Sequence, residues 1–259
     1  THGSADLVRD GAVVEPQIPV GGTRVMVPCG EEYEYETSLS TQGATDTVLY
    51  GLDIWGQLWG IDDDGGVGRA SRIVSWGMSC AMIVSHYEAS DPGPTNLYVN
   101  DAWADGDGDG LGMALEAELG TCDSNVDPGC LLVFDTADTD RDGLDDGAEV
   151  FGIDDPWFPQ YLPRWGADPR HKDAFIEVDY TADFASNPFT GADAEDAAAY
   201  YGVGGADDLQ NPDGQPGVTL HMDIGSDPLD PALAALYGDW GGSSQVPVGT
   251  DYAAAPATY

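Results

Sequence analysis

The sequence contains very little positive charge. Lysine and arginine number 8, with Lys172 as the only lysine, against 47 aspartates and glutamates, and the net charge of the 259 residues is −39. A surface this acidic repels phosphate backbones and anionic lipid headgroups, which excludes nucleic acid as a partner. The chain also lacks an apolar run long enough to cross a bilayer, so membrane insertion is not expected.

The shortage of positive charge has a second consequence, because so many carboxylates repel one another. Bound divalent cations or a salty medium must offset that repulsion. Two calcium ions, each carrying two positive charges, would change the net charge from −39 only to −35. The sequence therefore predicts either further bound cations or a high-salt environment, and it does not separate the two.

Cysteine is scarce and no C-x-x-C motif occurs; the four cysteines are Cys29, Cys80, Cys122 and Cys130. An even number is typical of disulfide bonds in an exported protein. Of the three connectivities we expect Cys29–Cys80 and Cys122–Cys130, with buried free thiols as the alternative. The chain begins at Thr1 and not at methionine, which indicates a processed protein that is secreted and located outside the cell or at its surface.

The hydrophobic pattern predicts a β-rich N-terminal half. Hydrophobic residues make up 42% of the chain, enough to build packed cores. Short segments that are typical of strands lie at residues 32–37, 47–52, 73–76 and 81–86, separated by Gly or Asp clusters, which predicts a β-sandwich over residues 27–100. Residues 1–26, interrupted by prolines, are expected to form an extended N-terminal arm or edge strand.

The C-terminal part, residues 156–259, is expected to be a mixed α/β module with an extended tail. Residues 174–180 and 218–224 alternate like strands. Residues 192–201 and 231–237 are typical of helices with acidic N-termini. The expected fold is therefore mainly β: an N-terminal sandwich, a connector over residues 101–155, and a small α/β module.

Part of the β region resembles a known family. The resemblance is carried by residues 46–50 (DTVLY), 56–58 (GQL), 62–66 (DDDGG), 71–73 (SRI) and 81–84 (AMIV). In this order they are similar to the bacterial pre-peptidase C-terminal (PPC) domain. The resemblance implies a small jelly-roll-like sandwich that serves secreted peptidases as a non-catalytic accessory or binding module. Cys80 falls where the family has a Gly-Thr-Tyr-like turn, which fits a disulfide there.

Two copies of the motif D-x-D-x-D-G-L-x-x-x-x-E follow, at residues 105–116 and 138–149. An EF-hand-type loop gives calcium oxygen ligands from positions 1, 3, 5, 7, 9 and 12, with glycine at position 6. Without a cation, three carboxylates converging on one turn would repel one another, which argues against a merely solvated acidic turn. We predict at least two calcium ions, with ligands from Asp105, Asp107, Asp109, Leu111 (carbonyl), Glu116, Asp138, Asp140, Asp142, Leu144 (carbonyl), Asp146 and Glu149.

The loops differ at position 9, where Met113 offers no oxygen and water is expected, whereas the second loop has Asp146. Residues 97–103 are typical of a strand, and no amphipathic helix is expected before either loop. Helices are predicted after each loop at 112–119 and 145–151. This arrangement resembles thrombospondin type 3 and dockerin-like loops, which implies structural calcium and not a switch. Further cation candidates are Asp62, Asp63 and Asp64, with a plain hairpin turn as the alternative.

A second resemblance concerns possible catalysis. Residues 165–180 and 211–225 are similar to the opening segment of secreted bacterial zinc metallopeptidases, whose HExxH helix lies further downstream. This sequence has no HExxH motif, no G-x-S-x-G elbow and no P-loop, and its four histidines are far apart. Zinc is therefore not expected, no catalytic residue is assigned, and the chain as given is more consistent with a non-enzyme.

Three functions remain. The favoured one is a secreted, calcium-binding, non-catalytic structural or adhesive protein, a filament or matrix subunit that associates with itself or with extracellular matrix and cell-surface components. Strand addition by residues 13–20 or by the tail would provide a route. The second is the N-terminal portion of a secreted zinc metallopeptidase. The third is a glycan- or protein-binding module that uses Trp55, Trp59, Trp76 or Trp103 as platforms, although these tryptophans are expected to be core residues.

Overall fold

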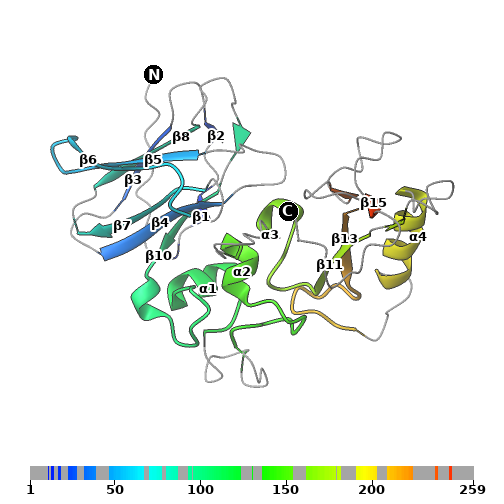
Figure 1. Cartoon of the computed structure of the whole chain (residues 1–259). Coiled ribbons are helices and arrows are strands. Elements are labelled where there is room, and N and C mark those ends of the chain that lie inside the picture. Colours follow the sequence, from blue (N-terminus) through cyan, green and yellow to red (C-terminus); the bar gives the residue numbers. More distant parts are fainter. Residues whose placement is uncertain are drawn as a thin grey trace. The chain divides into compact units, whose positions relative to one another are not determined.

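The structure is a computed structural model in which the chain divides into two compact units, Thr1–Pro169 and Arg170–Tyr259 (Figure 1). The described residues are 11, 13–14, 17–18, 23–27, 32–38, 47–66, 70–77, 80–86, 93–94, 96–123, 130, 136–153, 162–178, 180–181, 191–202, 209–223, 237–238 and 245–246. The division into arm, sandwich, connector and C-terminal module stays a prediction.

Two four-stranded antiparallel sheets form the body of the first unit (Figure 1). One sheet has the order β1 (Val13–Val14), β10 (Asn96–Asn100), β4 (Glu32–Ser38), β7 (Arg72–Trp76). The other has the order β3 (Thr23–Met26), β8 (Ala81–His86), β5 (Thr47–Leu52), β6 (Leu58–Asp62). A short pair joins β2 (Gln17–Ile18) to β9 (Gly93–Pro94). The four predicted strands and the mainly β fold are confirmed; the jelly-roll detail stays a prediction.

The two sheets share one hydrophobic core. Alternation places its side chains, as in β7, where Ile73 and Ser75 are buried while Arg72, Val74 and Trp76 are exposed. The core cluster consists of Val25, Val27, Tyr35, Leu49, Ile73, Met82, Val84, Leu97 and Val99. β1 and β3, which lie within the residues expected to form the arm, pair with β10 and β8 of the same chain.

Thr47, Asp62 and Ser71, which belong to the segments that resemble the PPC domain, make hydrogen bonds with neighbouring strands and turns. The hydroxyls of Thr37 and Thr47 lie 2.7 Å apart, and Ser71 Oγ donates to the Thr47 carbonyl at 2.6 Å. All three residues are buried, so this network satisfies polar groups that would otherwise be costly. Asp62 Oδ2 accepts hydrogen bonds from the main-chain N–H groups of Gly65 and Arg72, each at 2.8 Å. The contacts of Asp62 are thus those of a turn that ties β6 to β7.

The expected connector, which carries the two acidic loops, packs on strand β10. It contains η1 (Ala102–Ala104), α1 (Met113–Leu119) and α2 (Asp146–Phe151), followed by α3 (Leu162–Trp165). The helices predicted after each loop are confirmed. The strand predicted at residues 97–103 is present as β10 only as far as Asn100, because residues 102–104 form the 3-10 turn η1. A second hydrophobic cluster holds the helices on β10 and includes Tyr98, Leu111, Leu115 and Val150, with Val13, Leu119 and Phe151 packed against them.

The second unit contains a parallel sheet of β11 (Asp173–Glu177), β13 (Thr219–Asp223) and β14 (Tyr237–Gly238), and a pair of β12 (Tyr180–Thr181) with β15 (Gln245–Val246). Helix α4 (Gly191–Tyr201) packs on β13 through a small cluster of Ala194, Leu220 and Met222 (Figure 1). Most of the helix predicted at 231–237 lies outside the described residues, and Tyr237 belongs to β14.

Candidate metal centre

The two acidic loops repeat the same hydrogen-bond pattern. Main-chain N–H groups at positions 4 and 6 donate to the carboxylate at position 1, at 2.6 and 3.1 Å for Asp105 and at 2.7 and 3.0 Å for Asp138. The N–H of position 7 donates to the carboxylate at position 5, at 2.7 Å for Asp109 and 2.8 Å for Asp142. Each loop is therefore closed around its aspartates by its own main chain.

This closure requires left-handed backbone at positions 4 and 6. The φ angles there are 91° at Gly108 and 99° at Gly110 in the first loop, and 69° at Arg141 and 101° at Gly143 in the second. Glycine adopts this region without steric cost. Arg141 is the only non-glycine residue with positive φ in the described part of the chain, and it adopts this conformation at the point where the first loop has glycine.

The carboxylates that the sequence predicts as ligands converge, with the exception of Asp146. Within the first unit, three groups have candidate ligand oxygens within 4.8 Å of one another: Asp105, Asp107 and Asp123; Asp107, Asp109 and Glu116; Asp138, Asp140 and Asp142. The carboxylates of Asp142 and Glu149 also approach within 4.8 Å. Leu111 is buried in the second hydrophobic cluster, which fixes the main chain at position 7. The part of the site that sequence reasoning missed is Asp123.

Glu116 is the residue on which the fit of the first loop to a cation can be judged. Its side chain is 0% exposed, and neither carboxylate oxygen has a hydrogen-bond partner. Burial is the main cause that raises the pKa of Glu116 to about 9, and the charges of Asp109, Asp107 and Asp123 contribute to this shift. A buried carboxylate with no partner is costly, and an all-oxygen donor set suits a hard cation such as calcium. The residues present therefore fit the ion.

Two more carboxyls have strongly raised pKa values. Burial raises the pKa of Asp109 to about 7, with Asp107 and Asp105 adding to the shift. Burial likewise raises the pKa of Asp146 to about 8, with contributions from the charges of Asp109 and Asp138. A bound divalent cation would favour the charged forms, so its binding would be coupled to proton release at these carboxyls.

Asp146, at position 9 of the second loop, makes contacts of its own. Its Oδ1 accepts from the Thr139 N–H at 2.8 Å, and its Oδ2 accepts from Thr139 Oγ1 at 2.7 Å. The side chain is fully buried. Both oxygens are thus engaged by position 2 of the same loop, and the direct role of Asp146 as a ligand stays a prediction.

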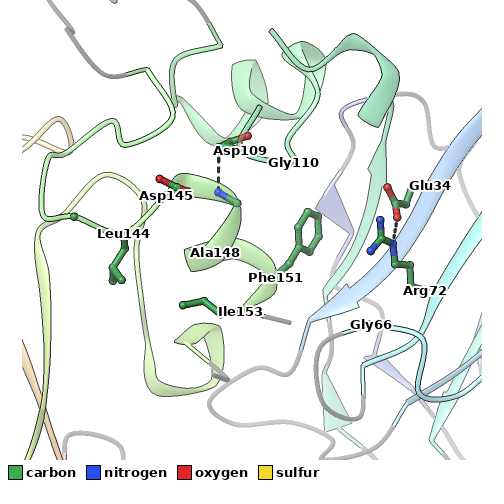
Figure 2. Close-up of a pocket in the computed structure, with 13 residues that line it drawn as sticks. Glu34, Gly66, Arg72, Asp109, Gly110, Leu144, Asp145, Ala148, Phe151 and Ile153 are labelled. Carbon is green, nitrogen blue, oxygen red and sulfur yellow. Dashed lines mark hydrogen bonds and ion pairs between the residues drawn. The ribbon is translucent and has the colours of Figure 1, made fainter. Parts of the chain in front are cut away.

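The two loops touch each other. Asp109 Oδ2 accepts from the main-chain N–H of Gly147 in the first turn of α2, at 3.1 Å. A Cβ atom at Gly147 would come within 2.0 Å of the Asp109 carbonyl oxygen, so only glycine permits this approach. Figure 2 shows Asp109 directed at the start of α2. The loops thus form one paired centre.

A pocket of about 420 Å³ lies beside this centre within the first unit (Figure 2). One wall carries the ion pair between Glu34 on β4 and Arg72 on β7, and the other carries α2 with Phe151. Its lining residues are Glu34, Gly66, Arg72, Asp109, Gly110, Gly143, Leu144, Asp145, Gly147, Ala148, Phe151, Gly152 and Ile153. Its ionisable side chains are Glu34, Arg72, Asp109 and Asp145.

The disulfide predicted between the loops is present, because Cys122 is bonded to Cys130. Cys80 is also disulfide-bonded; its predicted partner Cys29 lies outside the described residues. For the secondary cation candidates, Asp62 serves the turn described above, and Asp63 and Asp64 are exposed. Among the described residues, none of the three belongs to a converging acidic group.

Histidines of the second unit are paired with carboxylates. His221 Nε2 lies 2.7 Å from Asp173 Oδ1, and its ring stacks on Phe175 with centroids 4.4 Å apart. His171 Nδ1 lies 3.1 Å from Asp213 Oδ2. Within the described ranges, no group of converging metal-ligand side chains contains a histidine.

The expectation that the tryptophans are core residues is wrong for three of them. Trp55, Trp76 and Trp103 are 77%, 60% and 69% exposed. Trp76 and Trp103 lie together, with ring centroids 6.1 Å apart. Trp59 is half-buried and packs against the core cluster, since its ring lies over Gly51, where a Cβ atom would approach it to 2.7 Å.

The chain has little detectable similarity to known proteins. No protein-family model matches the chain, and no curated protein matches it. One crystal structure is similar to part of it: the pre-peptidase C-terminal domain of a collagenase from Bacillus anthracis, at 12% identity and a TM-score of 0.28, covering 38% of this chain and 95% of that one. A TM-score this low carries no argument, so the PPC relationship stays a resemblance of residues. In the described part of the chain, no helix is both long and apolar enough to span a membrane.

Proposed function

We propose that this chain is a secreted, non-catalytic structural protein whose paired loops each bind one calcium ion. The observation that carries the proposal is Glu116, a fully buried carboxylate without a hydrogen-bond partner that converges with Asp107 and Asp109. A divalent cation is the partner that this geometry lacks. The Cys122–Cys130 disulfide supports an oxidising, extracellular environment.

A structural role for calcium suits the surroundings better than a switch does. The loops are closed by their own main chain and joined to each other, and their helices share a buried cluster with β10. Opening the pair would expose that cluster. Extracellular modules bind calcium with dissociation constants of roughly 10⁻⁴–10⁻³ M. At ten times that concentration, each ion would stabilise the fold by about 1.4 kcal/mol.

Calorimetric titration tests the proposal. Protein stripped of metal should bind two calcium ions, and Glu116→Gln and Glu149→Gln should each abolish or strongly weaken one of the two. Asp64→Asn is the matched control, because it also removes one negative charge but lies on an exposed turn and belongs to none of the converging groups. The absence of calcium binding by the folded, unmodified chain at millimolar concentration would refute the proposal.

We extend the proposal to self-association, because the edge strand β6 and the turn before it expose large apolar side chains. Ile54, Trp55, Leu58 and Ile61 are 63%, 77%, 52% and 58% exposed. β6 is the terminal strand of its sheet among the described strands, and such edges template pairing with another chain. Light scattering with electron microscopy should find ordered assemblies in millimolar calcium that dissolve in chelator. A monomer in both conditions would refute assembly without touching calcium binding.

A second candidate function is a glycan- or protein-binding module, favoured by the exposed Trp76–Trp103 pair. Stacking on such rings is a common recognition mode. A glycan array should then report binding. Trp76→Ala and Trp103→Ala should abolish this binding, and Trp55→Ala should leave it unchanged.

The metallopeptidase alternative can be tested on the gene sequence downstream of Tyr259, where an in-frame HExxH motif would support it.

A further inference from the structure

The first loop lacks an oxygen at position 9. Met113 occupies that position, and its side chain is 54% exposed. In the second loop the corresponding residue is Asp146, whose Oδ1 accepts the N–H of position 2, Thr139, at 2.8 Å. This hydrogen bond fixes a carboxylate against the start of the second loop, and the loop itself supplies that carboxylate.

Asp123 makes the same contact in the first loop from outside the motif. Its Oδ1 accepts the N–H of position 2, Gly106. Its carboxylate also lies within 4.8 Å of those of Asp105 and Asp107, which are positions 1 and 3. Asp123 thus provides the carboxylate that Met113 does not.

The residue at position 2 is adapted to this arrangement. A Cβ atom at Gly106 would lie 2.6 Å from Asp123 Oδ1 and 2.8 Å from Oδ2. Any other residue at position 106 would therefore displace the carboxylate. The φ angle of Gly106 is not among the positive ones, so close approach, and not backbone conformation, is what requires glycine here.

The chain around Asp123 is held at several points. Cys122 forms the disulfide with Cys130, and its N–H donates to Thr139 Oγ1 of the second loop at 3.1 Å. The preceding N–H, of Thr121, donates to the Glu116 carbonyl at 3.0 Å. Asp123 is consequently attached to a segment that is anchored to both loops.

We propose that Asp123 is a ligand of the first calcium site in place of position 9, and that the Cys122–Cys130 disulfide holds it there. The inference rests on the proposed function. It does not rest on acidic residues alone, because Glu116 is completely buried, has no hydrogen-bond partner and shares Asp107 with the group that contains Asp123. First-loop calcium affinity would then depend on the disulfide, and second-loop affinity would not.

Terbium luminescence can follow the first loop, because Trp103 lies two residues before Asp105 and can sensitise an ion bound there. Displacement of terbium by calcium would be measured in the full chain and in Asp123→Asn, Gly106→Ala and Asp64→Asn. Asp123→Asn and Gly106→Ala should weaken the first site at least about tenfold. Asp64→Asn should leave it unchanged, and calorimetry should find the second site unchanged in all three variants.

Reduction of the disulfide tests the positioning role. In the unmodified chain, reductant should weaken the first site as Asp123→Asn does, and in Asp123→Asn it should cause no further loss. Two sites of unchanged affinity in Asp123→Asn would overturn the inference while leaving calcium binding intact. A chain that binds neither terbium nor calcium would overturn the proposed function and the inference with it.

Discussion

Asp109 in the first loop accepts a 3.1 Å hydrogen bond at Oδ2 from the N–H of Gly147, which lies 38 residues further along the chain. The N-cap residue of α2, Asp145, makes no side-chain cap hydrogen bond. The N–H of Gly147, at the start of α2, therefore receives its hydrogen-bond acceptor from Asp109 and not from the N-cap residue of the helix, Asp145. A ligand of one predicted ion thus fixes the helix that carries Glu149, a ligand of the other.

We predict that Gly147→Ala separates the loops. The added Cβ would meet the Asp109 carbonyl oxygen at 2.0 Å, so the backbones must move apart. The free energy of unfolding in calcium should fall by about 1–3 kcal/mol, and both ions should bind more weakly. Urea unfolding and calorimetry would measure this. Gly60→Ala is the control, because a Cβ there meets nothing within 4 Å; equal effects of the two substitutions would contradict the contact.

Leu115 should couple the segment that carries the two acidic loops to the β-sheets of the first unit. It is 0% exposed and packs in the cluster with Tyr98 of β10 and Val150 of α2. Leu115→Ala should lower the free energy of unfolding by about 2–5 kcal/mol. Met113→Ala, on the same helix at a site 54% exposed, should change it by less than about 0.5 kcal/mol. If the two variants unfold at the same denaturant concentration, the helix is not anchored as described.

The sequence predicted much of this architecture because its signals are local. Strands β4, β5, β7 and β8 can be predicted from short apolar runs between turn residues. Each acidic loop can be predicted from its motif, because the spacing of the aspartates and the glycine determines the turn that the loop makes. Strand β6 was missed because Gly60 and the exposed Leu58 and Ile61 do not follow a buried/exposed alternation, and its pairing with β5 shifts register.

Asp123 was missed for a different reason. It lies outside the motif, and only the return of the chain after α1 brings its carboxylate to Gly106. No motif spacing predicts that contact. The one local sign in the sequence is the glycine at position 106, where a Cβ atom would collide with the Asp123 carboxylate. The tryptophans were misjudged because large apolar area usually implies burial, whereas Trp76 lies on the outward face of β7.

Arg141 should cost stability through its backbone. It has φ 69° at position 4, where the first loop has Gly108. The left-handed region costs a non-glycine residue about 1–2 kcal/mol, while glycine loses more entropy on folding. Arg141→Gly should therefore stabilise the chain by up to about 1 kcal/mol, measured as a rise in the thermal midpoint in calcium. Arg141→Ala is the control, and it should not give this gain.

The stability of the calcium-free protein should fall as pH rises. Burial raises the pKa of Asp109 to about 7, of Asp146 to about 8 and of Glu116 to about 9. The folded state thus keeps protons that the unfolded chain releases near pH 4. The contribution of these protons to stability is complete below about pH 4 and is lost progressively up to about pH 9.

Calcium should reverse this dependence, because the ion takes the place of the protons. Affinity should rise with pH, so calcium should raise the thermal midpoint much more at pH 8 than at pH 5. General repulsion in a chain of net charge −39 gives the calcium-free slope the same sign, so variants must separate the two causes. In the absence of calcium, Glu116→Gln cannot ionise and should flatten the slope between pH 7 and 9. Asp64→Asn removes the same charge from the surface and should not. A calcium-free protein that grows more stable from pH 5 to 9 would show that the buried carboxyls are not protonated as their surroundings require.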